Sequence, residues 1–574
     1  MVASTYPRTF VPKDLKVASF ADVEPLYLAL LDRPIDSPAA LERWLLDFSE
    51  LTAVVDEGGS RRYIDKSCHT DDPAIEKAYL DWIEEVDPKV KPYFFKLQKK
   101  LLDSPHRAAL TDKRYEMLAK KWRPDVELFR DQNIPLETEI AKLNNEYDKT
   151  CGAMTVNFRG QELTLQQLGR FLEEPDRATR EEAFRLSIAR RMQDRETIES
   201  IFDQQLPIRQ RIARNAGLDD FREFTWMAYK RFDYTPDDCA RFADAIAATV
   251  VPLVNEFDRQ RKQELGLERL RPWDAYVDVK NRPPLRPFRE DQIDLLVDKT
   301  KEIYNRMSPQ LADELESLRR NKNLDLASRK GKQPGGYQAT LEEQREPFIF
   351  MNAVGLQRDI EILLHEGGHA FHTIAARGEP LQFLRSAPIE FCEVASMSME
   401  ALGAEHYDVV YTDPADAARA KRTYFEGVIR ILPWIATVDM FQQWLYTHPG
   451  HSRDERATEW LRLRERFGSS PEHMDWSGFE DWRRIEWQRQ LHLFHAPFYY
   501  VEYGIAQLGA LQLWMKAREN PRQALANYRA ALALGGTRPL PELFAAAGIR
   551  FDFSERTLGP LMNAVREELA QLPV

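Results

Sequence analysis

The stretch His365-Glu366-Gly367-Gly368-His369 places two imidazoles and a carboxylate within five residues. Residues four apart on an α-helix share one face, so His365 and His369 could bind the same metal ion. Glu366 follows His365 directly and could reach a water molecule beside that ion. The pattern is typical of zinc sites in which the glutamate acts as a general base, whereas a solvated helix face is the alternative reading.

The flanking sequence predicts the helix that must carry these side chains. An apolar run ends at Leu364, and apolar residues continue at Ala370, Phe371 and Ile374. Glycine costs up to about 1 kcal/mol relative to alanine inside a helix, so two adjacent glycines are unfavourable in a helix that only faces solvent. We therefore expect a substrate or a second helix to approach the backbone closely at residues 367 and 368.

A catalytic zinc ion needs a third protein ligand and an open fourth position. Glu390, Glu393 and Glu400 follow the motif, and helical spacing places all three on nearly one face. Spacing alone leaves the choice among them open. Cys392 would point away from Glu393 on the same helix, and we expect it to be a small buried residue.

The chain resembles the oligoendopeptidase F and thimet oligopeptidase family of zinc peptidases. Four segments are similar to family motifs: the glycine turn Pro334-Gly335-Gly336-Tyr337, the strand from Pro347 to Asn352, the zinc helix over 359–372, and the second zinc helix at Glu393-Val394-Ala395-Ser396 with Glu400. The resemblance extends from roughly Val156 to the C-terminus. It implies that Glu393 is the third ligand of one zinc ion. Gly367 departs from those family branches that carry a larger residue there.

The segment from His492 to Tyr503 is similar to the family's histidine-and-tyrosine segment. Amide hydrolysis develops an oxyanion that needs hydrogen-bond donors, and the resemblance implies that His492, Tyr499 and Tyr503 are those donors. Without the resemblance, such an aromatic cluster would suggest core packing with polar tips. Tyr500 would point to another face, and we expect His495 to be structural or to face the substrate.

Glu366 is the expected general base, which takes a proton from the attacking water and later passes it to the leaving amine. Metal-bound histidines usually donate their second N–H to an oxygen atom, and Glu400 and Asp359 are candidates for that role. His372 lies one turn beyond His369, and we interpret it as a neighbour of the site and not as a ligand.

Composition limits the partners of the chain. A net charge of −12 at pH 7 argues against a nucleic-acid partner. The sequence contains no apolar run of about 18 residues, so no membrane span is expected. The N-terminal sequence lacks the apolar core of a signal peptide, and the four cysteines are widely spaced and form no disulfide framework. We therefore expect a cytoplasmic protein, and its oligomeric state stays open.

Helical periodicity dominates the chain and predicts a mostly α fold. We expect an N-terminal helical region over 1–150 and a catalytic region over 151–574, with the zinc-binding core at about 345–510. A hairpin is predicted around Arg159-Gly160, a strand at Pro347–Met351, and an exposed loop or frayed helix from Arg319 to Lys332. The resemblance further implies two helical lobes around a deep substrate channel, with a small β-sheet near the zinc.

These features predict a zinc-dependent oligoendopeptidase that hydrolyses internal bonds of short, unstructured peptides. One alternative is a metallocarboxypeptidase or dipeptidyl carboxypeptidase on a similar helical scaffold, which would need a cation for the terminal carboxylate. Another is a non-catalytic scaffold with a decayed site, although the intact set of His365, Glu366, His369 and Glu393 argues against it. If the Pro347–Met351 strand lies at a sheet edge, it could pair with an extended peptide.

Overall fold

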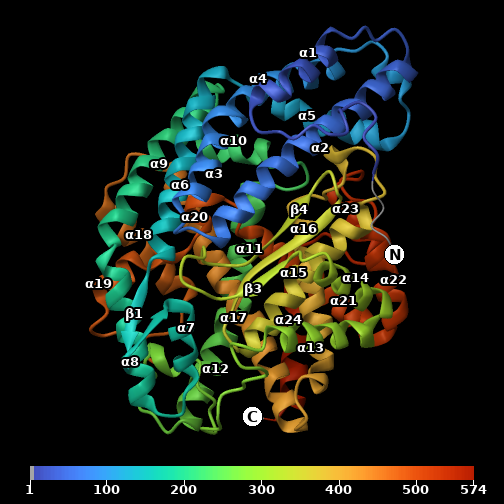
Figure 1. Ribbon diagram of the computed structural model, residues 1–574. Coiled ribbons are helices and arrows are strands. Elements are labelled where there is room, and N and C mark those ends of the chain that lie inside the picture. Colours follow the sequence, from blue (N-terminus) through green and yellow to red (C-terminus); the bar gives the residue numbers. More distant parts are fainter. Residues whose placement is uncertain (1–5, 574) are drawn as a thin grey trace.

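The computed structural model describes residues 6–573, and the fold is mostly helical with two small sheets (Figure 1). Side-chain caps start several helices, and the dipeptide Asp72-Pro73 predicts one of these starts from sequence. Asp72, for example, accepts hydrogen bonds from the backbone N–H groups of Ala74 and Ile75 at the start of α3, with Pro73 as its first residue. In the described part of the chain, no helix combines the length and apolar character needed to cross a membrane.

The N-terminal helices pack around a hydrophobic core of their own. Buried residues of this core lie between Val11 and Trp122, and Leu381 and Leu384 join them from the second half of the chain. Leu143 and Tyr147 of the sixth helix instead belong to the large central core. The boundary near residue 150 stays a prediction. The helices are α1 (Glu24–Asp32), α2 (Pro38–Cys68), α3 (Pro73–Glu85), α4 (Asp87–Leu102), α5 (Lys113–Leu128) and α6 (Ile134–Gly152).

A β-hairpin and a helical array follow. The antiparallel pair β1–β2 turns at Arg159 and Gly160, both with positive φ, which confirms the predicted hairpin. The elements of this part are β1 (Thr155–Phe158), β2 (Gln161–Thr164), α7 (Leu165–Gly169), α8 (Arg177–Gln193), α9 (Arg195–Asn215), α10 (Phe221–Ala228), α11 (Pro236–Thr249), α12 (Val251–Glu264), α13 (Ile293–Met307) and α14 (Pro309–Arg320).

The second sheet has the strand order β3-β5-β4, with β3 (Leu324–Ala327) parallel and β4 (Tyr337–Leu341) antiparallel to β5 (Glu346–Ala353). The predicted strand at Pro347–Met351 is confirmed as part of β5, but β5 is the central strand, so the sheet edge beside α15 (Gln357–Ala376) is formed by β4 and not by this segment. The exposed loop or frayed helix expected from Arg319 to Lys332 is wrong in part. It contains β3, and Lys332 is buried, where its ammonium group donates to the carbonyl oxygen of Met351 on β5.

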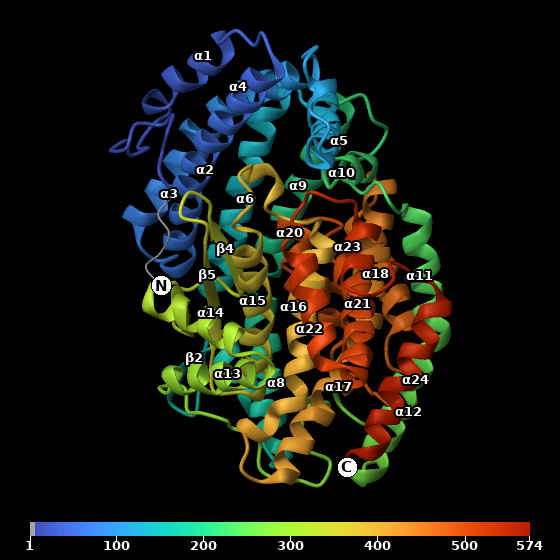
Figure 2. The same cartoon turned by 90° about the vertical axis from the view of Figure 1, so that its right-hand side faces the viewer.

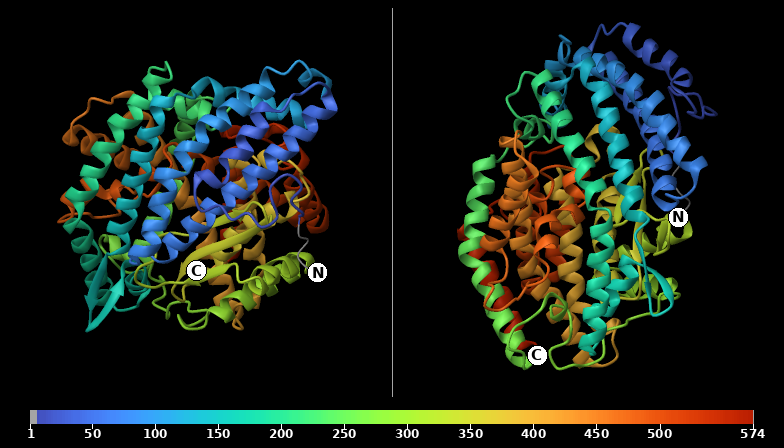
Figure 3. Two further views of the ribbon diagram at one scale, coloured as in Figure 1. Left: turned by 45° about the horizontal axis from the view of Figure 1, so that its top comes forward. Right: turned by 90° about the vertical axis from the view of Figure 1, so that its left-hand side faces the viewer.

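The rest of the chain is helical and contains the helices of the site. In Figure 2 the sheet and α13–α15 lie on one side, α17, α18, α21 and α24 lie on the other, and α16 runs between them. Figure 3 shows the same arrangement from two further sides. The helices are α15 (Gln357–Ala376), α16 (Ile389–Gly403), α17 (Pro414–Thr447), α18 (Arg453–Phe467), α19 (Glu480–Ile485), α20 (His492–His495), α21 (Val501–Glu519), α22 (Pro521–Leu532), α23 (Leu540–Ala546) and α24 (Glu555–Gln571).

The two glycines of the motif permit close packing around α15. A Cβ atom at Gly368 would lie 2.5 Å from the carbonyl oxygen of Ala395 on α16, and one at Gly367 would overlap the hydroxyl group of Tyr304 on α13. That hydroxyl donates to the carbonyl oxygen of Leu364 at 2.9 Å. The expectation that a second helix approaches this backbone is therefore confirmed.

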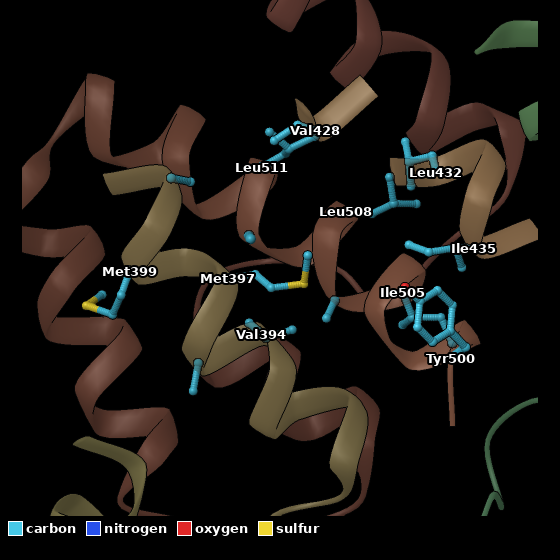
Figure 4. Close-up of a cluster of buried hydrophobic side chains, with 14 of the residues drawn as sticks. Val394, Met397, Met399, Val428, Leu432, Ile435, Tyr500, Ile505, Leu508 and Leu511 are labelled. Carbon is cyan, nitrogen blue, oxygen red and sulfur yellow. The ribbon is translucent and has the colours of Figure 1, made fainter. Parts of the chain in front are cut away.

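Apolar side chains fix α16 against α17 and α21 behind the site (Figure 4). Val394 of α16, Leu432 of α17 and Leu508 of α21 are all at most 1% exposed. Full burial of such a side chain contributes about 1.5–3 kcal/mol, so this cluster holds the helix that carries Glu393 in a fixed position. Its labelled members are Val394, Met397, Met399, Val428, Leu432, Ile435, Tyr500, Ile505, Leu508 and Leu511.

Candidate active site

The structure brings His365 and His369 of α15 together with Glu393 of α16. One ligand atom from each lies within 4.8 Å of the others. Glu393 Oε2 is 3.4 Å from His365 Nε2 and 3.6 Å from His369 Nε2. Ligand atoms around a tetrahedral zinc ion stand about 3.3 Å apart, given zinc–ligand bonds of about 2.0–2.2 Å. The spacing and the donor types therefore fit zinc.

Glu400 holds His365 in an orientation suited to metal binding. The Nδ1 atom of His365 lies 2.6 Å from Glu400 Oε1. Because a carboxylate only accepts, Nδ1 carries a hydrogen, and Nε2 is the nitrogen left to bind a metal ion beside Glu393. Burial alone would lower the pKa of His365, but the carboxylates of Glu393 and Glu400 raise it well above its usual value.

The other glutamate and aspartate candidates lie elsewhere. Glu390 accepts a hydrogen bond from the Tyr234 hydroxyl at 2.6 Å, away from the two histidines. Asp359 caps α15 by accepting from the backbone N–H groups of residues 354–356 at 2.8–2.9 Å, so it does not orient a histidine. A carboxylate at a helix N-terminus is favoured by the helix dipole, and this interaction fixes the start of α15.

Glu366 is the buried carboxylate next to the cluster. It is 5% exposed, and its Oε2 atom has no hydrogen-bond partner within residues 6–573. Burial raises the pKa of Glu366, and the neighbouring imidazoles His365 and His369 lower it. An unpartnered buried oxygen is costly unless a water molecule or substrate group uses it, which suits a carboxylate that accepts a proton during a reaction.

His492, Tyr499 and Tyr503 come together beside the group of His365, His369 and Glu393. The Tyr499 hydroxyl donates to Glu393 Oε1 at 2.5 Å, and the Tyr503 hydroxyl oxygen lies 3.1 Å from His492 Nε2. Burial raises the pKa of both tyrosines and lowers the pKa of His492 to about 4. The tyrosines therefore keep their protons and the imidazole stays neutral near pH 7.

The backbone before these tyrosines bends sharply at Phe498, whose φ of 66° is unusual for a residue with a side chain. The Phe498 N–H donates to Gln442 Oε1 at 2.6 Å, and its carbonyl oxygen accepts from the Arg231 guanidinium at 2.5 Å. These two buried bonds hold the strained bend. Tyr499 follows this bend directly and contacts Glu393 of α16, and α21 starts at Val501.

Three neighbouring side chains do not belong to the cluster. His495 Nε2 lies 3.0 Å from Asp148 Oδ1 of α6, and the same carboxylate forms a 2.8 Å ion pair with Lys66 of α2. His372 Nε2 accepts from the Ala387 N–H at 3.1 Å, and its pKa is lowered to about 4 by burial. Cys392 is half-buried, whereas a small buried residue was expected.

A cavity of about 240 Å³ lies between β4, α15 and α16. Sequence reasoning missed the part of its wall that lies beyond the metal-binding side chains. Most of these residues come from β4, the β4–β5 turn and the loop before α16, and no local spacing connects them to the motif. Thr373 is the exception, because it lies on α15 four residues after His369, where helical spacing could have indicated it. The missed lining residues are Gln338, Thr340, Glu342, Arg345, Thr373, Arg385 and Ser386.

The chain matches the family described as peptidase family M3 over residues 170–561, and the peptidase M3 N-terminal domain over residues 10–129. It is 25% identical to an oligoendopeptidase F homolog of Borreliella burgdorferi over 304 residues, 51% of this chain and 49% of that protein. An oligoendopeptidase F homolog of Mycoplasma pneumoniae is 22% identical over 318 residues, 53% of this chain and 51% of that protein. The matched region thus spans about half the length of these curated relatives.

Solved structures share the whole fold. A structure of Pz peptidase A with an inhibitor superposes with a TM-score of 0.91 at 25% identity, and covers 99% of both chains. An oligoendopeptidase F structure gives a TM-score of 0.92 at 26% identity, again over 99% of both chains. Since the family match covers residues 170–561 and the fold agrees along the chain, the chain belongs to peptidase family M3.

Proposed function

We propose that the chain is a zinc-dependent oligoendopeptidase that hydrolyses internal bonds of short, unstructured peptides. The observation that carries the proposal is the group of His365, His369 and Glu393, whose ligand atoms lie within 4.8 Å of one another. The unpartnered Oε2 of Glu366 lies beside this group on the same helix. Membership of peptidase family M3 supports peptide hydrolysis as the reaction.

Glu366 acts as the general base in this proposal. A bound zinc ion would supply Lewis-acid chemistry, since it lowers the pKa of water to about 7 and polarises a carbonyl group. Glu366 takes the proton of the attacking water and passes it to the leaving amine. Tyr503 provides the hydrogen-bond donor near the developing oxyanion, while His492 binds the Tyr503 hydroxyl and Tyr499 binds Glu393. The burial of these groups strengthens such bonds.

The edge strand β4 is the proposed docking site for the substrate backbone. Gln338 and Thr340 of β4 line the cavity beside α15, and Thr340 Oγ1 lies 3.1 Å from Thr373 Oγ1 on that helix. An extended peptide can add a strand to a free sheet edge, whereas a folded protein rarely exposes one. This geometry supports short, unstructured peptides as substrates.

The structure also gives the carboxypeptidase alternative a concrete basis. Arg345 and Arg385 line the cavity and could receive a terminal carboxylate. Arg385 is already 3.3 Å from Glu342 Oε2, so part of this positive charge is compensated and the endopeptidase remains our proposal. Amidation of the C-terminus of a test peptide decides between them, because only the carboxypeptidase would lose activity.

The test of the proposal compares the wild type with Glu366→Gln on an internally quenched peptide. We expect one zinc ion per chain in both proteins and a kcat lower by about 100- to 10,000-fold in the variant. Glu361→Gln, on the same helix but outside the cavity, is the matched control and should keep wild-type activity. Unchanged hydrolysis in Glu366→Gln, or a wild type that binds no zinc, would contradict the proposal.

A further inference from the structure

Four polar side chains form a hydrogen-bonded chain that leads from α17 to the cavity. Trp434 Nε1 on α17 donates to Gln490 Oε1 at 3.0 Å. Gln490 Nε2 lies 2.8 Å from His492 Nδ1, and His492 Nε2 lies 3.1 Å from the Tyr503 hydroxyl oxygen. Tyr503 lines the cavity beside Glu366 and Glu393. The first two members of this chain, Trp434 and Gln490, have no role in the function proposed above.

Trp434 determines which atom donates and which accepts in the first hydrogen bond of this series. An indole nitrogen can only donate a hydrogen bond, so the amide atom that faces Trp434 must be the oxygen of Gln490. The opposite orientation would place two donors face to face. The NH₂ group of Gln490 therefore points at His492 Nδ1, which must act as an acceptor.

The protonation of His492 Nδ1 and Nε2 then determines which atom donates to Tyr503. A neutral imidazole carries one hydrogen, and if Nδ1 accepts, that hydrogen resides on Nε2. His492 Nε2 therefore donates to the oxygen of Tyr503, and the hydroxyl hydrogen of Tyr503 must point away from the ring. Within residues 6–573 the Tyr503 hydroxyl has no hydrogen-bond partner other than His492. Because Tyr503 lines the cavity, its hydroxyl hydrogen is available to a group bound there.

We propose that Gln490, oriented by Trp434, is a positioning residue that fixes the Nε2–H tautomer of His492 and thereby directs the Tyr503 hydroxyl hydrogen at the substrate carbonyl oxygen. The two tyrosines then have different roles. Tyr499 gives its hydrogen to Glu393 Oε1 at 2.5 Å and orients that carboxylate, whereas Tyr503 is left free to donate to the oxyanion. The inference rests on the proposed peptidase function.

The substitution Gln490→Glu replaces the amide nitrogen by an oxygen atom and so reverses the donors and acceptors of the hydrogen bonds from residue 490 to Tyr503. One carboxylate oxygen still accepts from Trp434, but the other must accept a hydrogen from His492 Nδ1. Nε2 then becomes an acceptor and takes the hydrogen of Tyr503 away from the cavity. Loss of one oxyanion donor costs about 100- to 1000-fold in kcat, so we expect a loss of that order with KM within about threefold of wild type.

Two comparisons distinguish a reversed hydrogen-bond direction from a general loss of structure around residue 490. Gln490→Met removes the same hydrogen bonds but imposes no reversed direction, so its kcat should fall by less than about tenfold. In a Tyr503→Phe background, Gln490→Glu should cause no further loss, because its effect acts through the missing hydroxyl. The inference is overturned if Gln490→Glu keeps wild-type kcat, if Gln490→Met is equally impaired, or if the loss persists in the Tyr503→Phe background.

The pH of the assay provides a further readout. Above about pH 8 the new carboxylate and His492 carry no extra proton, and the reversed direction holds. At lower pH one proton added to this pair restores a donor at Nε2, so the loss of kcat should shrink as the pH falls. Glu393 and His495 also act on the pKa of His492. The titratable side chains that lie against its ring are Tyr499, Tyr500 and Tyr503, with ring centroids 5.0–5.6 Å away. A loss independent of pH would contradict the inference.

Isotope-edited NMR of the histidine ring nitrogens tests the tautomer without an activity assay. The His492 signal, assigned by its absence in His492→Gln, should show the hydrogen on Nε2 in the wild type and on Nδ1 in Gln490→Glu. A wild type that cleaves no peptide but has Nε2–H would refute the proposed function and leave the hydrogen-bond direction intact. A wild type with the hydrogen on Nδ1 would overturn this inference alone.

Discussion

Replacement of Gly368 by alanine should move the zinc helix away from α16. The added Cβ would lie 2.5 Å from the Ala395 carbonyl oxygen and from Ser396 Cα, whereas ordinary van der Waals contact begins at 3.4 Å. Both contacts are backbone atoms of a buried helix, which cannot rotate aside as a side chain can. To restore ordinary contact, α15 and α16 must move apart by about 0.9 Å at this point.

This displacement is large on the scale of a metal site, where ligand distances hold to about ±0.2 Å. Glu393 would move with α16, and the histidines would stay with α15. Loss of a residue that merely orients a ligand weakens metal binding by about 10- to 100-fold, so displacement of a ligand should weaken it by at least about 100-fold. Overpacking costs about 1–3 kcal/mol and improved helix propensity returns up to about 1, so the chain should stay folded.

Competition with a chromophoric chelator measures the zinc affinity, and thermal unfolding confirms that the variant is folded. The matched control is Gly367→Ala combined with Tyr304→Phe, in which the closest contact of the new Cβ becomes a ring carbon at 3.0 Å on a side chain, in place of the hydroxyl oxygen at 2.2 Å. Its zinc affinity should stay within about fivefold of wild type. A Gly368→Ala variant that binds zinc as tightly as the wild type would refute the argument that this glycine sets the ligand geometry.

Three further predictions concern partners of the site. Glu400→Gln should weaken zinc binding by about 10- to 100-fold in the chelator assay, because it loosens the hold on His365, and an unchanged affinity would contradict this. The pKa of His372 is lowered to about 4, so the unfolded chain binds more protons below about pH 6.5 and the free energy of unfolding should fall by about 3 kcal/mol down to pH 4. His372→Gln should flatten this slope in urea unfolding; an equal slope would exclude the residue as its cause. Asp148→Asn should cost about 3–5 kcal/mol in the same assay, since Lys66 is left buried without its partner, and a loss below 1 kcal/mol would argue against a buried charge pair.

Local signals predicted much of the helical framework. The Asp72 cap, the Pro73 start and the hairpin at Arg159-Gly160 follow from residue types that favour one backbone geometry. The strand β3 (Leu324–Ala327) escaped prediction because four residues carry little periodicity and its parallel partner β5 follows some twenty residues later. Lys332 was misread for the same reason, since only the folded sheet reveals the carbonyl groups that bind its ammonium group.

The predictable part of the site is the part that one helix determines. His365 and His369 share a face because of the helical repeat alone. The choice of Glu393 among three glutamates depends on how α16 packs against α15, which the sequence expressed only through resemblance to a family. Gln490 escaped prediction because its partner Trp434 is 56 positions away. Long-range hydrogen bonds of this kind leave no local spacing to recognise.

The buried Asp148 carboxylate has a consequence for how this chain can change in evolution. It contacts Lys66 from α2 and His495 from the segment that carries the candidate oxyanion donors, so three distant parts of the gene encode one interaction. A mutation at one of these positions leaves a buried charge at another without its partner. The three positions should therefore vary together among relatives. Recombination that replaces the first 129 residues, the span of the N-terminal domain match, should yield an active hybrid only when the donor supplies a cation at position 66.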